Sequence, residues 1–197
     1  GGVERGVLDL TKGLIARGVP PDEIAILYRA NFQSRALEEA MLKAHVPYRV
    51  LGVRFFERQE VKDLLAYLKA ALNPSDFTSR RRIINVPVRG LGKVTVAKML
   101  SGDIASLPPR TQEKIKVFDG LLADIRETAL VEPPSVTVRY ILERSGLHES
   151  LRRGGSDDLE RLENLRELVT LSLAYDETPG ETGIAALLTA AALVSDQ

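Results

Sequence analysis

Apolar side chains after residue 58 recur every three or four residues, and this period constrains the fold more than any other feature. One stripe consists of Val61, Leu64, Leu65, Leu68, Ala71 and Leu72, and a second of Ile115, Phe118, Leu122 and Ile125. This spacing places apolar groups on one face of an α-helix. The pattern predicts that residues 58–197 are helical, with helices at 60–72, 77–85, 93–100, about 109–125, 135–145, 156–173 and 182–194.

Residues 1–57 have a different pattern. A modest amphipathic helix is predicted at 4–17 and another at 34–45, with Leu37, Met41 and Leu42 inward. A nearly continuous apolar run at 23–29 predicts a buried strand, and residues 48–52 predict a second short strand. Two strands and two helices form too small a sheet to be stable alone. We therefore expect a mainly α protein with a small, incomplete α/β part at residues 1–57 and a helical part at 58–197.

Helix ends can be predicted at several places. Ser135 follows two prolines and is a candidate cap for the helix after it, and Gly146 is a candidate for the position just past its end. Gly154 and Gly155 precede the next predicted helix, whose apolar side consists of Leu159, Leu162, Leu165, Val169 and Leu173.

Positive charge gathers in residues 80–100. This stretch contains six basic residues and no acidic one, although the whole chain balances 27 Lys and Arg against 27 Asp and Glu. The basic residues are Arg80, Arg81, Arg82, Arg89, Lys93 and Lys98. The excess charge is therefore local, and an anionic partner is expected there.

A glycine turn lies at the centre of the basic stretch. The run Arg89-Gly90-Leu91-Gly92 precedes the predicted helix at 93–100. Glycine allows positive φ and a close approach of the backbone to a ligand. The free N–H groups of the helix's first turn carry the positive end of the helix dipole, so the turn is a candidate phosphate site.

The glycine spacing, with apolar residues at 91 and 100, looks like the hairpin of helix-hairpin-helix modules, which bind the backbone of a DNA duplex without reading bases. The alternative is a corner between two helices that needs glycine only for its geometry. The nearby cations favour phosphate binding. Such contacts contribute affinity and register but little sequence information.

Composition excludes several other classes of site. The chain has no Cys, so disulfides and thiolate metal sites are excluded. Its two histidines, His45 and His148, lack the spacing of metal ligands. No apolar stretch approaches the length of a membrane span, and the N-terminus lacks the apolar core of a signal peptide. We therefore expect a soluble, cytoplasmic protein with no membrane partner and no metal site.

Three blocks of sequence together resemble the UvrD/Rep/PcrA-type superfamily 1 DNA helicases. They are IAILYRANFQSR at 24–35, FFERQEVKD at 55–63 and NVPVRGLG at 85–92, and their order and separations also match. The resemblance runs over essentially the whole chain. It implies that residues 1–57 belong to the second RecA-like domain, called 2A, and that residues 58–197 form the helical 2B subdomain inserted into it.

The resemblance also implies roles for individual residues. The residues at the DNA duplex would be Arg89, Gly90, Leu91, Gly92, Lys93 and Thr95. Those beside the single-strand and nucleotide side of 2A would be Tyr28, Arg29, Asn31, Gln33, Ser34 and Arg35. Phe55 and Phe56 are expected to pack in a core or hinge rather than stack on bases. This chain has one glycine, Gly52, before the second block where the family often has two.

The motifs of ATP hydrolysis are absent from the chain. It has no Gly-x-x-x-x-Gly-Lys-Ser/Thr loop and no recognisable Mg²⁺-binding acidic block after a strand. We therefore expect no cofactor in this chain and no ATPase activity by it alone, with ATP and Mg²⁺ bound in a larger parent. The family implies a 3′-to-5′ DNA helicase of repair or replication. Its partners would be duplex or junction DNA, the rest of the helicase chain and repair proteins.

Two other functions remain open on the sequence. The basic helical surface could dock acidic patches of repair proteins, which would make the chain a protein-interaction module. An independent α/β enzyme is the weakest alternative, because no nucleophile-base pair, metal cluster or paired carboxylates can be found at useful spacing.

Overall fold

The computed structural model describes residues 2–28, 33–50 and 54–195, without the side chains of Val3, Leu100, Val194 and Ser195. The chain divides into two compact units, residues 1–58 and residues 59–197. The sequence pattern put the boundary between residues 57 and 58. That these units are parts of domains 2A and 2B stays a prediction.

The first unit contains both predicted helices, α1 (Gly2–Ala16) and α2 (Gln33–Lys43), which pack against each other. Two short 3₁₀ helices, η1 (Pro21–Glu23) and η2 (Phe55–Glu57), follow α1 and α2 respectively. Met41 is buried on α2 as expected, whereas Leu42 is 45% exposed. Phe55 and Phe56 are buried and meet edge to face, which agrees with the expectation of core packing.

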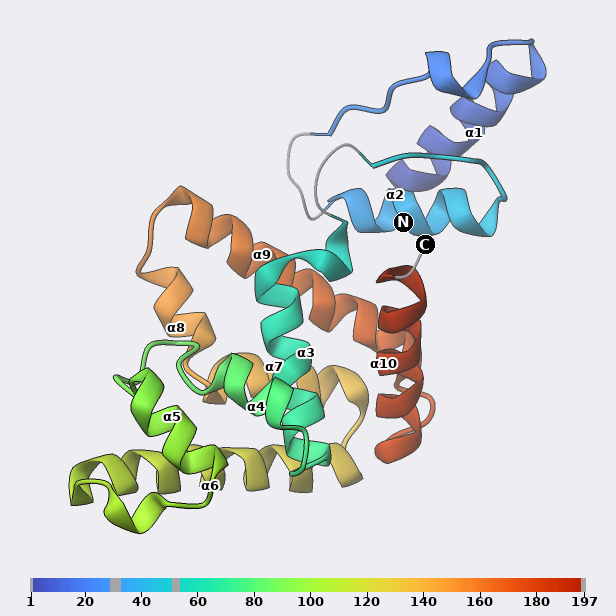
Figure 1. The fold of residues 1–197 in the computed structure, drawn as a ribbon. Coiled ribbons are helices and arrows are strands. Elements are labelled where there is room, and N and C mark those ends of the chain that lie inside the picture. The colour runs from blue at the N-terminus through green and yellow to red at the C-terminus, as the bar shows by residue number, and fades with distance from the viewer. Residues whose placement is uncertain (1, 29–32, 51–53, 196–197) are drawn as a thin grey trace. The chain divides into compact units, whose positions relative to one another are not determined.

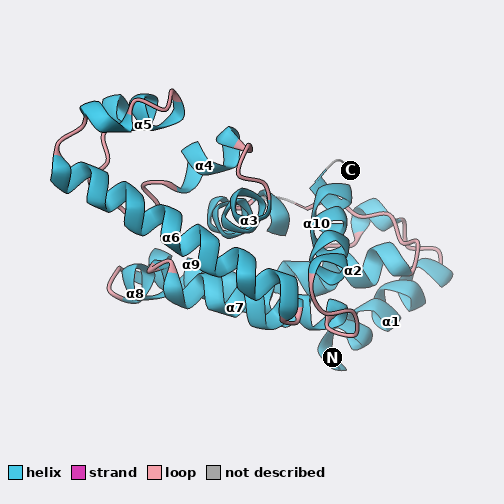
Figure 2. Ribbon diagram, turned by 90° about the horizontal axis from the view of Figure 1, so that it is seen from below, coloured by secondary structure: helices cyan, strands magenta, loops and turns pink. Residues whose placement is uncertain are grey.

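The two predicted strands are wrong for the described part of the chain, which contains no strand (Figure 2). Residues 24–28 and 48–50 are irregular, and Arg29, Leu51 and Gly52 lie outside the described residues. The side chain of Leu27 is 94% exposed rather than buried. A strand is stabilised by ladder hydrogen bonds to a neighbour, and an apolar run without a paired neighbour does not form one.

The second unit consists of helices joined by turns and loops, with no strand among its described residues. In chain order its longer helices are α3 (Gln59–Leu72), α4 (Phe77–Ile83), α5 (Lys93–Leu100), α6 (Pro109–Val131), α7 (Pro134–Arg144), α8 (Leu147–Arg152), α9 (Ser156–Ser172) and α10 (Glu181–Ser195). Two 3₁₀ helices, η3 (Ile104–Ser106) and η4 (Leu173–Tyr175), lie in the connections. The mainly α prediction is confirmed.

Helix α3 is the centre of this unit, where it packs against α4, α6, α7 and α9 (Figure 1). The predicted α3 and α6 stripes are buried except for Leu72, which is half-buried. On α9, Leu162 and Leu165 are buried, but Leu159 is 47% exposed, and Leu173, which follows in η4, is 54% exposed. Both ribbon views place α5 at the end of the unit opposite α10 (Figures 1 and 2).

The predicted cap at Ser135 is wrong. Ser135 lies inside α7, and its backbone N–H and hydroxyl both donate to the carboxylate of Asp176, at 2.9 and 2.5 Å. A distant acid therefore satisfies the N-terminus of α7 and complements its dipole. Gly146 follows α7 with φ of 87°, the left-handed conformation expected of the residue past a helix end.

The cap of α4 gives a test by pH. The carboxylate of Asp76 accepts hydrogen bonds from the hydroxyl and the backbone N–H of Ser79, and these bonds hold the pKa of Asp76 below its ordinary value. The stabilisation is present above the ordinary pKa and is lost as pH falls through the lowered one. We expect Asp76→Ala to reduce the free energy of unfolding at pH 7 by about 1 kcal/mol. Asp76→Asn caps the helix without titrating, so it should keep most of that stability. Urea titrations over a pH series should show that its free energy of unfolding depends less on pH in the acid range than that of wild type.

Candidate nucleic-acid interface

The glycine turn connects α4 to α5. Gly90 has φ of +70°, in the left-handed region that favours glycine. Gly92 is the N-cap residue of α5, with φ of −70° and ψ of 169°, and no side chain caps the helix there. The N–H groups of Lys93, Val94 and Thr95 lie in the first turn of α5, where helix geometry provides no partner. These donors are available to an anion.

The turn projects into solvent. Gly90, Gly92 and Lys93 are exposed, and the apolar side chains of Val88 and Val94 on either side are 89% and 70% exposed. Thr95 is half-buried. Leu91 is 1% exposed, so its side chain fixes the turn to the helical core while its neighbours face outward. The backbone around Gly92 is therefore accessible to a large ligand.

Asn85 holds the turn in this shape. Its Oδ1 accepts the backbone N–H groups of Arg89 and Leu91 at 3.2 and 3.0 Å, and its side-chain amide donates to the carbonyl of Leu91. Sequence reasoning did not select Asn85 as a site residue. An asparagine a few residues before a glycine pair is the signal that could have found it, because its side chain can bond nearby backbone groups.

The guanidinium of Arg89 points into the protein. Its Nη1 lies 3.0 to 3.3 Å from four carbonyl oxygens, those of Ile83, Ile84, Val86 and Pro87. Its Nη2 donates to the hydroxyl of Tyr67 at 2.5 Å and to the carbonyl of Ser145 at 3.1 Å. The guanidinium also lies over the ring of Phe118, 5.3 Å from its centroid. Arg89 therefore joins α3, α6, the end of α4 and the end of α7 behind the turn.

Tyr67 completes this cluster. Its side chain is fully buried, and burial raises the pKa of its hydroxyl although the charge of Arg89 acts in the opposite direction. The neutral hydroxyl donates to the carbonyl of Val86 while it accepts from Arg89. The segment before the glycine turn is thus fixed from two sides.

The six cations of residues 80–100 are not all unopposed, which corrects the sequence interpretation. Arg80 pairs with Asp119 at 2.5 Å, and Arg82 pairs with the buried Asp63 at 2.6 Å. No ion pair between described residues involves the exposed Arg81 or Lys93. The acids that reduce the local charge come from α3 and α6.

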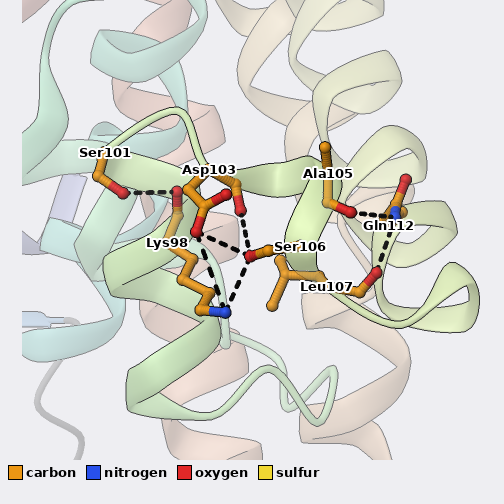
Figure 3. A network of polar contacts seen from close by, with 7 residues as sticks. All are labelled: Lys98, Ser101, Asp103, Ala105, Ser106, Leu107 and Gln112. Atoms are coloured by element: carbon orange, nitrogen blue, oxygen red, sulfur yellow. Dashed lines mark hydrogen bonds and ion pairs between the residues drawn. The ribbon is translucent and has the colours of Figure 1, made fainter.

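Lys98 also has partners, as Figure 3 shows. Its Nζ donates to the hydroxyl of Ser106 at 2.8 Å and lies 4.0 Å from a carboxylate oxygen of Asp103. The same hydroxyl donates to Asp103. The charge of Lys98 is therefore shared with the loop after α5, and the uncompensated charge is concentrated toward the start of that helix.

The residues predicted on the single-strand and nucleotide side of the first unit are described in part, and their role stays a prediction. Ser34 is buried and accepts a hydrogen bond from Arg58 at 2.9 Å, and Arg35 pairs with Glu39 at 2.6 Å. Tyr28 is half-buried in an irregular segment, and Gln33 is exposed at the start of α2. The other two predicted residues, Arg29 and Asn31, lie outside the described residues.

Metal ligands do not cluster among the described residues. They contain no group of three or more His, Cys, Asp or Glu side chains that could hold a metal ion. A glycine-rich phosphate loop of the ATPase type is absent from the sequence. None of the helices in the described part is long and apolar enough to cross a bilayer.

Comparison with known proteins identifies the family. Residues 6–197 match the family described as "UvrD-like helicase C-terminal domain". The chain belongs to this family. The resemblance to UvrD-type helicases found in the sequence is therefore confirmed.

Relatives with similar sequences bear helicase names. This UvrD-like chain is 37% identical to ATP-dependent DNA helicase PcrA of Staphylococcus epidermidis, over 88% of this chain and 26% of the relative. It is 33% identical to DNA helicase II of Haemophilus influenzae, over 91% of this chain and 28% of that protein. The chain therefore spans about a quarter of the length of these relatives and corresponds to part of a UvrD/PcrA-type C-terminal region.

Proposed function

We propose that residues 59–197 bind the sugar-phosphate backbone of duplex DNA through the glycine turn, as the 2B part of an ATP-dependent 3′-to-5′ DNA helicase. Duplex or junction DNA is the partner in this proposal, and the turn acts like the hairpin of a helix-hairpin-helix module. The observation that carries the proposal is the exposed, uncapped start of α5 next to Lys93. Amides, a helix dipole and a cation there all favour the same anion.

The rigidity of the turn supports this function. Asn85 binds the backbone of the turn, the guanidinium of Arg89 binds carbonyls of the segment before it, and Leu91 is buried below it. A preorganised site loses little conformational entropy when it binds. Backbone donors contact phosphates of any sequence, so the proposal predicts binding with little base preference.

ATP hydrolysis belongs to the parent protein in this proposal. The relatives are named as DNA helicases, one of them as ATP-dependent. The sequence has no phosphate-binding loop of the ATPase type, so no step of the proposal passes through ATP in this chain. The role of the chain is to bind the duplex and the rest of the helicase, in repair or replication.

Gly92→Asp separates binding from folding. A Cβ at Gly92 has open space around it, and φ of −70° is allowed for any residue. Aspartate is a better N-cap than glycine by a few tenths of a kcal/mol, so the fold should be kept or slightly stabilised. Its carboxylate would occupy the proposed phosphate position. We expect the affinity for a fluorescein-labelled 20-bp duplex, measured by anisotropy, to fall by roughly tenfold or more.

Gly155→Asp is the matched control. Gly155 is the N-cap residue of α9, has φ of −80°, and also has open space around a Cβ. Gly155→Asp changes the net charge by the same amount as Gly92→Asp and also caps a helix, but it lies outside the glycine turn. Its duplex affinity should therefore stay within about twofold of wild type. An equal loss of duplex affinity in both variants would show that the effect comes from net charge alone. An unchanged affinity of Gly92→Asp would show that the glycine turn does not bind the duplex.

The binding assay also distinguishes the alternative of a protein-interaction module. Duplex affinity should fall steeply as salt rises, because several phosphates are neutralised at once. A chain that shows no duplex binding at low salt, but retains a repair protein after nuclease treatment, would support the docking module instead.

A further inference from the structure

A lysine far along the chain lies beside the glycine turn. Lys114 belongs to α6, and its Nζ donates to the carbonyl of Arg89 at 2.8 Å. A Cβ built on Gly90 would stand 3.1 Å from the same nitrogen. The ammonium group is therefore in contact with the backbone of the turn, on a side chain that is itself half-buried.

The charge of Lys114 is not compensated by a nearby carboxylate. No Asp or Glu in the described part of the chain lies within ion-pair distance of it, whereas Arg80, Arg82 and Lys98 each have an acidic partner. An ammonium group has three donors, and the described residues supply Lys114 with a single acceptor, the Arg89 carbonyl. Its remaining donors can bind an anion at the turn.

We propose that Lys114 is a second phosphate-binding cation of the duplex interface, acting with Lys93 and the amides of α5. This inference rests on the proposed function. The hydrogen bond to Arg89 holds the ammonium next to the turn before DNA arrives, so less side-chain entropy is lost on binding than for a freely moving lysine. The ligand is the phosphodiester backbone of duplex DNA.

The salt dependence of binding tests this role. Each phosphate neutralised contributes about 0.9 to the slope of log K against log salt concentration. We expect Lys114→Gln, which can still donate to the Arg89 carbonyl but carries no charge, to lower that slope by about 0.9. Its affinity for the labelled 20-bp duplex should fall by roughly fivefold to tenfold at about 0.1 M KCl.

Lys116→Gln is the control for overall charge. Lys116 is an exposed lysine of the same helix, two residues further along. Its replacement by Gln should leave the salt slope unchanged. Lys114→Arg keeps the charge and should restore most of the slope. Thermal unfolding of each variant checks that the fold is intact, and Lys114→Met serves as a second neutral variant if Lys114→Gln unfolds.

The outcomes are distinct for the two proposals. If wild type does not bind duplex DNA at any salt concentration, the proposed function fails and the inference with it. If wild type binds, and Gly92→Asp does not, but both neutral variants of Lys114 keep the wild-type slope, the inference on Lys114 alone is overturned. A loss of affinity without a change in the salt slope would show that Lys114 stabilises the turn but does not bind a phosphate.

Discussion

Arg89→Met is expected to reduce the free energy of unfolding of residues 59–197 by about 3 to 5 kcal/mol. The guanidinium is within hydrogen-bond distance of five carbonyl oxygens and the hydroxyl of Tyr67, which belong to separate elements of the fold. Methionine fills similar volume but cannot donate, so each of these groups loses a donor, although the carbonyls of Ile83 and Val86 keep bonds from the Val86 N–H and the Tyr67 hydroxyl. Each buried acceptor that loses its partner costs about 1 to 3 kcal/mol. Urea unfolding followed by circular dichroism measures the change.

Arg81→Met is the matched control for this experiment. Arg81 lies in the same basic stretch and is exposed, so its replacement should change stability by no more than about 0.5 kcal/mol. Arg89→Lys should recover only part of the loss, because one ammonium cannot reach both groups of acceptors. If Arg89→Met were as stable as Arg81→Met, the hydrogen bonds of the Arg89 guanidinium would not stabilise the segment before the turn.

Gly183→Ala is expected to destabilise the second unit by about 2 to 3 kcal/mol. Gly183 is buried in the first turn of α10, and a Cβ there would lie 1.9 Å from the carbonyl oxygen of Thr178. It would also lie 2.9 Å from the carbonyl oxygen of Tyr175 and from Pro134. The clash involves backbone atoms, which cannot move aside as a flexible side chain can. The midpoint of thermal unfolding should fall accordingly.

Gly120→Ala is the matched control, and we expect it to change stability in the opposite direction. Gly120 is exposed in the middle of α6, and a Cβ there has open space. Alanine should stabilise the helix by up to about 1 kcal/mol because it loses less backbone entropy on folding. The same substitution in two helices should therefore move the unfolding midpoint in opposite directions. A stabilised Gly183→Ala variant would show that α10 does not pack as closely as described.

The local pattern of the sequence was sufficient for most helices. The stripe from Ile115 to Ile125 repeats at helical spacing, and all four of its apolar residues are buried on α6. The position of the glycine turn and the left-handed conformation of Gly146 could also be predicted, because both depend on residues close in sequence. The apolar run at 23–29 gave a wrong strand prediction, because a strand depends on a paired neighbouring strand that no local pattern reveals. The roles of the DNA-facing residues stay predictions.

The sequence by itself determined most of the helical segments and the position of the glycine turn, because helix period and glycine geometry act over a few residues. The tertiary structure alone decided which charges remain available. Asp119 lies 39 residues from Arg80, and Asp63 lies 19 residues from Arg82, so their pairing depends on how α3, α4 and α6 pack. The same packing turns Arg89 inward and brings Lys114 to the glycine turn. Electrostatic interactions depend on distance in space rather than on separation along the chain, and only the folded protein sets that distance.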